Sequence, residues 1–276
     1  MVVELEDDLS ASGAKCRKLN RRWQALCCLY LPLMRAHEIW RYSRAPASGD
    51  PRQGWKLHLP ATVLTANDVL QRIAPLLQSR AVLFKAPASL QELNRLNCGL
   101  FYGYSQVGKF ITVYPRTTAE AVELAERLHE LTCRMPAPGV PFDRRFRPDS
   151  SVYYRYGSFE TLIVTTPDGL QLPAMRDPSG QLVPDLRYSE TSGPEWAADP
   201  FINWQAALPP QVIEPLESPL KTTFRAFQAL AQRGKGGVYK AFDFSVQPPR
   251  FCLLKEGRSG GEVCWDGRDG FWRIQH

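Results

Sequence analysis

The sequence predicts an α+β fold, in which helices flank a mixed or antiparallel sheet. Two observations carry this prediction. Segments of strand character alternate with segments of helical period between residues 54 and 166. At the start of two helical segments, a serine or threonine stands three residues before an acidic residue, which is the capping signal of a helix N-terminus.

The first elements are a strand over residues 55–59 and a helix that begins after Thr65. Thr65 is predicted to cap this helix with Asp68 in its first turn, and Pro75 inside it predicts a kink. A second strand covers residues 81–84, where the chain is continuously apolar.

The next elements follow the same alternation. Ser89 and Glu92 form a capping box ahead of leucines spaced by three residues. Residues 109–114 are rich in strand-forming side chains, and residues 117–133 form an amphipathic helix. Further strands are expected over residues 151–157 and 160–166.

The flanking segments carry weaker patterns. Residues 25–34 are apolar but too short to cross a bilayer, and are expected to pack on the domain as a helix or strand. Residues 44–54 are rich in Pro, Gly and Ser and predict a linker, while residues 169–219 show no clear period.

A second unit begins near Leu220. Residues 224–244 predict two strands joined by a glycine turn, a third strand ends at Lys255, and the last residues predict a short helix. The expected domains are therefore an N-terminal extension (1–49), a central domain (50–205) and a C-terminal β unit (206–276).

The composition limits the classes of function. The chain has 276 residues, of which 44% are hydrophobic, so it is expected to be globular and cytoplasmic, with no membrane partner. Seven cysteines are scattered without metal-ligand spacing, which predicts reduced thiols and no metal site. The net charge of +6 suits an anionic ligand, but the basic residues follow strand ends rather than one helix, which argues against nucleic acid.

The candidate reactive side chains are mostly cationic. Lys56 and His58 are two residues apart in a strand, so they share one face of the sheet. Neither paired carboxylates for hydrolysis nor a G-x-S-x-G or H-E-x-x-H motif occurs. Taken one at a time, a strand lysine is more often solvated and His58 more often structural. The other members of the set are Lys85, Lys109, Arg144, Arg145, Arg147 and Arg155.

Five segments carry a resemblance to a known family. "GWKLHLPAT", "LFK", "GKFITVYP", "DRRFRPDS" and "YYRYGSF" occur in this order. They resemble the lyase domain of class III lanthipeptide synthetases, which is similar to the phosphothreonine lyase effectors of pathogenic bacteria. The resemblance implies a phosphothreonine-lyase-like fold over the central domain. It also implies β-elimination of phosphate from phosphoserine or phosphothreonine, which gives dehydroalanine or dehydrobutyrine and needs no cofactor.

The resemblance also implies a role for each matched residue. Lys85 would be the base that removes the Cα proton, and His58 the acid that protonates the departing phosphate. Lys56 would be the electrophile that faces the substrate carbonyl or phosphate. The phosphate would be held by Arg144, Arg147 and Arg155, with Lys109 assisting.

The C-terminal unit resembles part of a protein-kinase N-lobe. Gly234 and Gly236 would belong to the nucleotide-covering loop and Lys255 would be the lysine of the third strand. No H-R-D or D-F-G sequence follows, so we expect an incomplete lobe that is inactive by itself, from a cut or naturally shortened reading frame. ATP and Mg²⁺ would be required only if a complete kinase domain were supplied elsewhere.

The expected partners are a phosphorylated precursor peptide and separate kinase and cyclase domains. Two alternatives stay open on sequence grounds. The cationic set could bind a phosphopeptide without chemistry, or the chain could be a docking fragment that pairs with a separately encoded kinase lobe.

Overall fold

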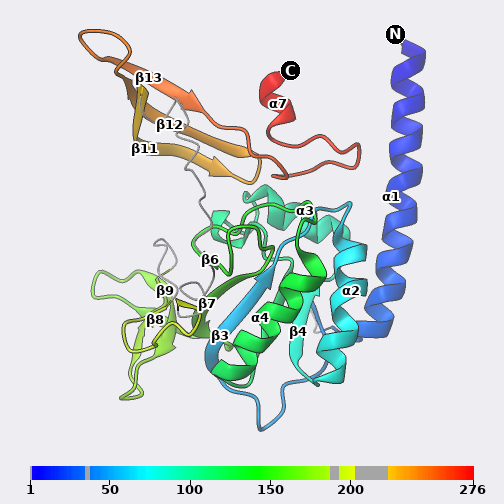
Figure 1. Cartoon of the computed structure of the whole chain (residues 1–276), viewed down its shortest axis with the longest axis vertical. Coiled ribbons are helices and arrows are strands. Elements are labelled where there is room, and N and C mark those ends of the chain that lie inside the picture. Colours follow the sequence, from blue (N-terminus) through cyan, green and yellow to red (C-terminus); the bar gives the residue numbers. More distant parts are fainter. Residues whose placement is uncertain (1, 35–37, 187–192, 203–222) are drawn as a thin grey trace.

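The computed structural model of the chain describes residues 2–34, 38–186, 193–202 and 223–276 (Figure 1). The predicted α+β class is confirmed: antiparallel sheets are flanked by helices. None of the described helices is long and apolar enough to span a membrane.

A seven-stranded sheet organises the central domain, with the order β1-β2-β4-β5-β3-β7-β6 and every neighbouring pair antiparallel. Its strands are β1 (Leu33–Met34), β2 (Trp40–Tyr42), β3 (Gln53–Leu59), β4 (Leu83–Pro87), β5 (Ile111–Tyr114), β6 (Arg144–Arg145) and β7 (Tyr153–Ser158). Residues 33–34 and 40–42, placed in the expected N-terminal extension, thus belong to this sheet as β1 and β2.

Four helices accompany the sheet: α1 (Val2–Tyr30), α2 (Ala66–Ser79), α3 (Leu90–Cys98) and α4 (Thr118–Thr132). Figure 1 shows α2 and α4 lying across one face of the sheet. Leu57, Phe84 and Val113 are fully buried on that face and join the core that the helices complete. Because side chains alternate along a strand, the residues between them point to the opposite face.

The helix starts confirm one predicted cap and correct another. The Ser89 hydroxyl accepts a hydrogen bond from the Glu92 amide at 3.1 Å, as expected. The cap at Thr65 is wrong: this residue has a helical backbone (φ −101°, ψ −12°) and makes no side-chain cap. The hydroxyl of Thr62 instead accepts hydrogen bonds from the amides of Leu64 and Thr65, so the side chain that binds the free amides ahead of α2 is that of Thr62.

The expected packing of residues 25–34 is confirmed. They form the last turns of α1 and strand β1, and Cys27 and Leu31 are buried in the core.

A second sheet joins the strand predicted over residues 160–166 to two strands in the segment for which no element was predicted. Its strands are β8 (Ile163–Thr165), β9 (Gln171–Arg176) and β10 (Leu182–Pro184), in the order β10-β9-β8. Turns at Gly169 and Gly180, both with positive φ, join them. β9 and β10 are short and largely exposed, so no apolar alternation marks them in the sequence.

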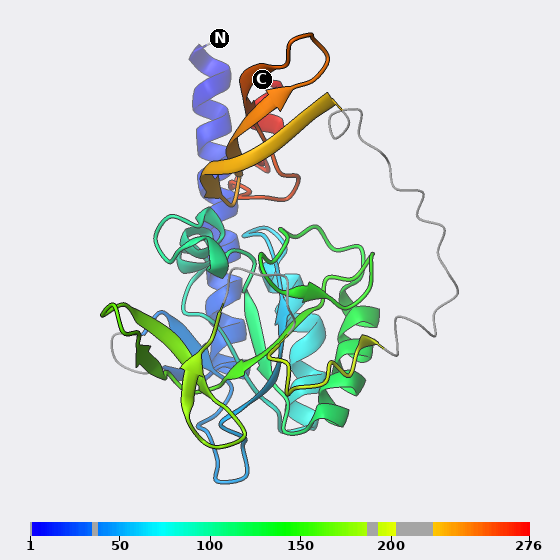
Figure 2. The ribbon, with the colours of Figure 1, turned by 90° about the vertical axis from the view of Figure 1, so that its left-hand side faces the viewer.

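The C-terminal sheet confirms the three predicted strands, β11 (Phe224–Arg233), β12 (Gly236–Asp243) and β13 (Arg250–Lys255), and α7 (Trp272–Gln275) follows. Figure 2 shows this sheet above the central domain. The two units touch where the Gly234 amide donates to the Cys98 carbonyl at 3.0 Å. The predicted domain boundary at residue 205 lies outside the described residues, and both boundaries stay predictions.

Candidate functional site

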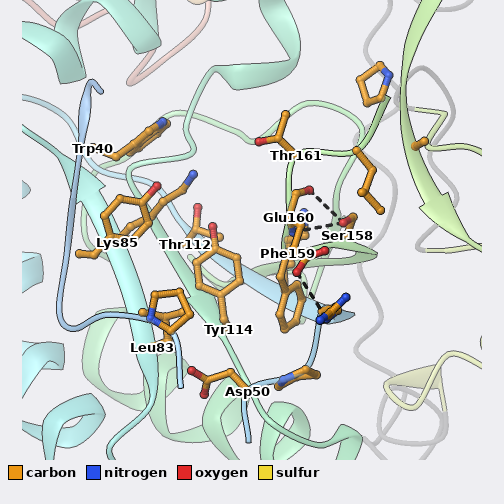
Figure 3. Close-up of a pocket in the computed structure, with 18 of the residues that line it drawn as sticks. Trp40, Asp50, Leu83, Lys85, Thr112, Tyr114, Ser158, Phe159, Glu160 and Thr161 are labelled. Atoms are coloured by element: carbon orange, nitrogen blue, oxygen red, sulfur yellow. Dashed lines mark hydrogen bonds and ion pairs between the residues drawn. The ribbon is translucent and has the colours of Figure 1, made fainter. Parts of the chain in front are cut away.

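A cavity of about 1120 Å³ opens on the sheet face opposite the helices. Its floor is made by β3, β4, β5 and β7, and its walls by residues 46–52 and by the segment that leads into β8 and β9. Figure 3 shows Lys85, Thr112 and Tyr114 on one side of this cavity and Phe159, Glu160 and Thr161 across from them.

Strand register brings the candidate residues into two neighbouring rows. Thr112 on β5 is paired with His58 on β3 and with Lys85 on β4, so these three side chains form one row across the floor. Lys56 on β3 is paired with Arg155 on β7 in the adjacent row. All five residues line the cavity, which confirms that Lys56 and His58 share a face.

A buried carboxylate lies at the centre of this cationic set. Asp143 Oδ2 is 2.5 Å from His58 Nδ1, and Asp143 Oδ1 is 3.3 Å from Lys109 Nζ and 4.0 Å from Arg155 Nε. Asp143 was not among the predicted site residues, because it begins the segment "DRRFRPDS", in which the three arginines are the more obvious phosphate ligands. A single acidic residue next to a basic cluster would have been the available signal.

Electrostatics make His58 neutral when the cavity is empty. Burial is the largest effect and lowers the pKa of His58 from 6.5 to about 4, although Asp143 raises it and Lys109 and Lys56 lower it further. Burial alone would raise the pKa of Asp143, but Lys109, His58 and Arg155 outweigh it and hold that pKa well below its usual range. Since Asp143 is ionised, the imidazole proton belongs on Nδ1, and Nε2 carries the lone pair.

This depressed pKa predicts how folding responds to acid. Between pH 6.5 and about 4 the unfolded chain binds a proton at His58 that the folded chain excludes, so the free energy of unfolding should fall as the pH is lowered through this window. Urea unfolding at several pH values should show the loss, on the order of 1–3 kcal/mol. The variant His58→Asn should show a shallower slope in the same window; equal slopes would contradict the prediction.

Arg155 is held by a second buried acid. Asp185, next to the end of β10, accepts from Arg155 Nη2 at 2.5 Å and from Nη1 at 3.4 Å. Both side chains are almost inaccessible to solvent. Asp185 was also missed, because it follows a strand that has no sequence pattern. The pair fixes the guanidinium at the cavity wall.

Lys85 is placed by an aromatic side chain from β2. Its Nζ lies 4.2 Å from the centre of the Trp40 ring, and both residues line the cavity (Figure 3). This contact with the ring orients Nζ of Lys85 at the open end of the row that also holds His58.

The structure does not bring two of the predicted arginines to the cavity. Arg144 pairs with Asp199 at 3.2 Å, and Arg147 pairs with Glu126 on α4. Arg145, the third arginine of this segment, donates to the Tyr153 hydroxyl. None of the three lines the cavity. Lys109, in contrast, lies at the cavity wall beside Asp143.

The residues proposed for nucleotide binding do not line this cavity. Lys255 ends β13 with an exposed side chain, and Gly234 packs so tightly on α3 that a Cβ there would come within 1.6 Å of the Asn97 carbonyl oxygen. Gly236 has a φ of +149° beside the Glu256 carbonyl. Within the described parts of the chain, no group of three or more His, Cys, Asp or Glu side chains could hold a metal ion.

Comparison with known proteins gives one matching family and one similar curated protein. The family model described as "RamC, N-terminal domain" matches residues 33–210. The chain is similar to the "Probable SapB synthase" of Streptomyces coelicolor (strain ATCC BAA-471 / A3(2) / M145), with 34% identity over 233 residues. The alignment covers 83% of this chain but 24% of that protein, so the chain spans about a quarter of its relative's length.

Proposed function

The chain belongs to the RamC N-terminal domain family, and from this premise we propose that it is a phosphoserine/phosphothreonine lyase of lanthipeptide biosynthesis. Its substrate would be a phosphorylated precursor peptide. The observation that carries the proposal is the row formed by Lys85, Thr112 and His58 on the floor of a cationic cavity.

The reaction is a β-elimination. Lys85, as the neutral amine, takes the Cα proton on Nζ and becomes an ammonium group, the electron pair forms the Cα–Cβ double bond, and the Cβ–O bond breaks as phosphate leaves. Neighbouring strands are about 4.8 Å apart, so Lys85 and His58 flank a space roughly 10 Å wide between their strands. This spacing suits a phosphorylated side chain that offers its Cα proton to Lys85 and its phosphate to His58.

The cations around the row stabilise the charges that develop. Lys56 faces the substrate carbonyl, where negative charge grows as the proton leaves, and Arg155 and Lys109 hold the phosphate oxygens. Neither a metal nor a nucleotide enters this chemistry. The phosphate itself would be installed beforehand by an ATP- and Mg²⁺-dependent kinase domain.

The neutral state of His58 is compatible with an acid role only once phosphate is bound. A phosphate monoester has a second pKa of about 6, so a fraction of the substrate carries a proton into the site. The dianion also favours imidazolium over imidazole, because an opposite charge close to the ring stabilises the charged form. The substrate thus allows His58 to act as an acid, either by bringing a proton or by raising the pKa of the imidazole through its negative charge.

The size and the walls of the cavity favour a peptide over a small phosphate ester. Tyr114 and Phe159 pack edge to face with their ring centres 5.0 Å apart, and Leu83 lies beside them on the floor. These side chains offer apolar contact area next to the cations. A volume of about 1120 Å³ also exceeds what one phosphorylated side chain fills.

Binding without chemistry is the second candidate, because Lys56, Lys109 and Arg155 line the cavity and could hold a phosphate whether or not elimination follows. The deciding experiment is incubation with a synthetic phosphothreonine peptide, followed by mass spectrometry and by a binding titration. Loss of phosphoric acid with formation of dehydrobutyrine supports the lyase. Saturable binding with an unchanged peptide mass would replace the lyase by the binding module.

Arg155 lines the cavity and Arg147 does not, so mutation of the two residues should have different effects. Arg155→Lys keeps the charge but loses the planar fork, so KM for the phosphopeptide should rise roughly 10- to 100-fold, the worth of one or two charged hydrogen bonds. Arg147→Lys makes the same change at a residue that pairs with Glu126 outside the cavity, and should leave KM within about twofold. Equal effects of the two substitutions would contradict the placement of the phosphate.

A further inference from the structure

One arginine of the C-terminal unit reaches into the central domain beside the cavity. Arg258 donates to the hydroxyl of Tyr104, which belongs to the short helix η1 (Tyr104–Gln106), and its guanidinium also lies 4.9 Å from the centre of the Tyr104 ring. The other groups bonded to Arg258 belong to its own unit: the Tyr239 hydroxyl, the Arg233 carbonyl and the Glu256 carboxylate.

Tyr104 connects this arginine to the buried acid of the site. Its ring packs at 90° on Phe142, with the ring centres 5.8 Å apart. Phe142 immediately precedes Asp143 and has a φ of +65°, a conformation that costs a non-glycine residue about 1–3 kcal/mol and persists only where neighbours hold it. The Tyr104 ring therefore packs against the residue that directly precedes Asp143.

A second contact joins the same two units a few residues away. The Gly234 amide donates to the Cys98 carbonyl, and the preceding residue, Asn97, is buried. Asn97 donates to the Ala61 carbonyl at 2.9 Å and accepts from the Gly108 amide at 3.2 Å. Gly108 directly precedes Lys109, whose Nζ lies 3.3 Å from Asp143, so both contacts lead to residues next to the same carboxylate.

We propose that Arg258 is a positioning residue for the elimination site: it holds Tyr104 against Phe142 and thereby fixes Asp143 and the orientation of His58. The inference rests on the proposed lyase function for its catalytic meaning, but its structural step is independent of that function. The C-terminal unit thus completes the lyase site, in addition to any role in phosphorylation.

The chemistry of Arg258 suits this role. Its guanidinium donates to four acceptors in fixed directions, two of them hydroxyls of different units, and a lysine ammonium offers fewer donors without a planar geometry. Arg258→Lys should therefore restore only part of the function. Arg268→Ala is the matched control: it removes the same charge from the C-terminal segment, where Arg268 contacts Asp266 and Trp272.

The structural step can be tested by NMR of the His58 ring in the full chain. In the parent protein the Nδ1 proton bound to Asp143 should give a downfield signal, assigned by its loss in His58→Asn. The charged groups that face this ring are Asp143, Lys109 and Lys56, with Arg155 behind Asp143, and none of the test variants alters them. Arg258→Ala should broaden or shift the signal through faster exchange with water, whereas Arg268→Ala should leave it unchanged.

Tyr104→Phe keeps the ring on Phe142 and removes only the hydroxyl, so it repeats the test if Arg258→Ala fails to fold. On the phosphothreonine peptide, Arg258→Ala should lower kcat roughly 10- to 100-fold with little change in KM, because small misplacements of a catalytic group have effects of this size. An unchanged His58 signal in folded Arg258→Ala and Tyr104→Phe would overturn the proposal even if the parent protein is an active lyase. A parent protein without lyase activity would leave the NMR result valid and would count against the proposed function alone.

Discussion

Replacing Lys85 by arginine is expected to abolish elimination while phosphopeptide binding survives. The guanidinium carries a positive charge and can stay against the Trp40 ring, but it does not release its proton in a protein, so it cannot take the Cα proton. Removal of a general base lowers rates by about 10²- to 10⁴-fold. Mass spectrometry of the phosphothreonine peptide should therefore show intact substrate, while a binding titration stays within a few-fold of the parent.

The matched control is Lys255→Arg, the same substitution at an exposed strand end of the C-terminal sheet, which should leave elimination unaffected. Lys85→Ala should be as inactive as Lys85→Arg, with weaker binding because it also loses the charge. Elimination by Lys85→Arg at the parental rate would remove Lys85 from the role of base.

The floor of the site was predictable because it depends on a local rule. Lys56 and His58 share a face since every second residue of a strand does, and the apolar residues between them decide which face is buried. Lys85 could be placed in a strand on the same grounds. The alternation of side chains does not predict the order of the strands in the sheet. That order places Lys85 on β4 and His58 on β3, on either side of β5.

The roles of the buried acids Asp143 and Asp185 could not be predicted, because their partners are distant in the sequence. Asp143 lies 85 residues after His58, and Asp185 lies 30 residues after Arg155 in a segment with no apolar period. The same reason explains why Arg144 and Arg147 were expected at the phosphate although neither lines the cavity. Their position next to Asp143 suggested a shared role, but the carboxylates of Asp199 and Glu126 take their side chains elsewhere.

Because of these buried acids, the basic residues of the cavity belong to a network of ion pairs and hydrogen bonds rather than to a purely cationic pocket. Asp143 contacts His58, Lys109 and Arg155, so removal of any one of the three leaves the others with a changed partner. Single alanine substitutions will therefore mix catalytic and structural losses. Substitutions that keep the contact with Asp143 and change only the proton chemistry are more informative.

His58→Asn meets this condition and should block departure of the phosphate. The asparagine amide can take the place of Nδ1–H as the donor to Asp143, so the carboxylate stays satisfied, but no group remains where Nε2 stood. We expect phosphate loss to fall by about 10²- to 10⁴-fold. His129→Asn, on α4 and away from the cavity, is the control and should leave the rate unchanged.

Deuterium labelling separates the acid from the base. In D₂O, His58→Asn still contains Lys85, so the Cα proton can be removed and a deuteron returned while the phosphate stays in place. Phosphopeptide recovered from His58→Asn should therefore carry deuterium at the phosphorylated residue, whereas peptide recovered from Lys85→Arg should carry none. Deuterium in the peptide from Lys85→Arg and none in the peptide from His58→Asn would mean that His58 removes the Cα proton, and the assignment of acid and base would have to be exchanged.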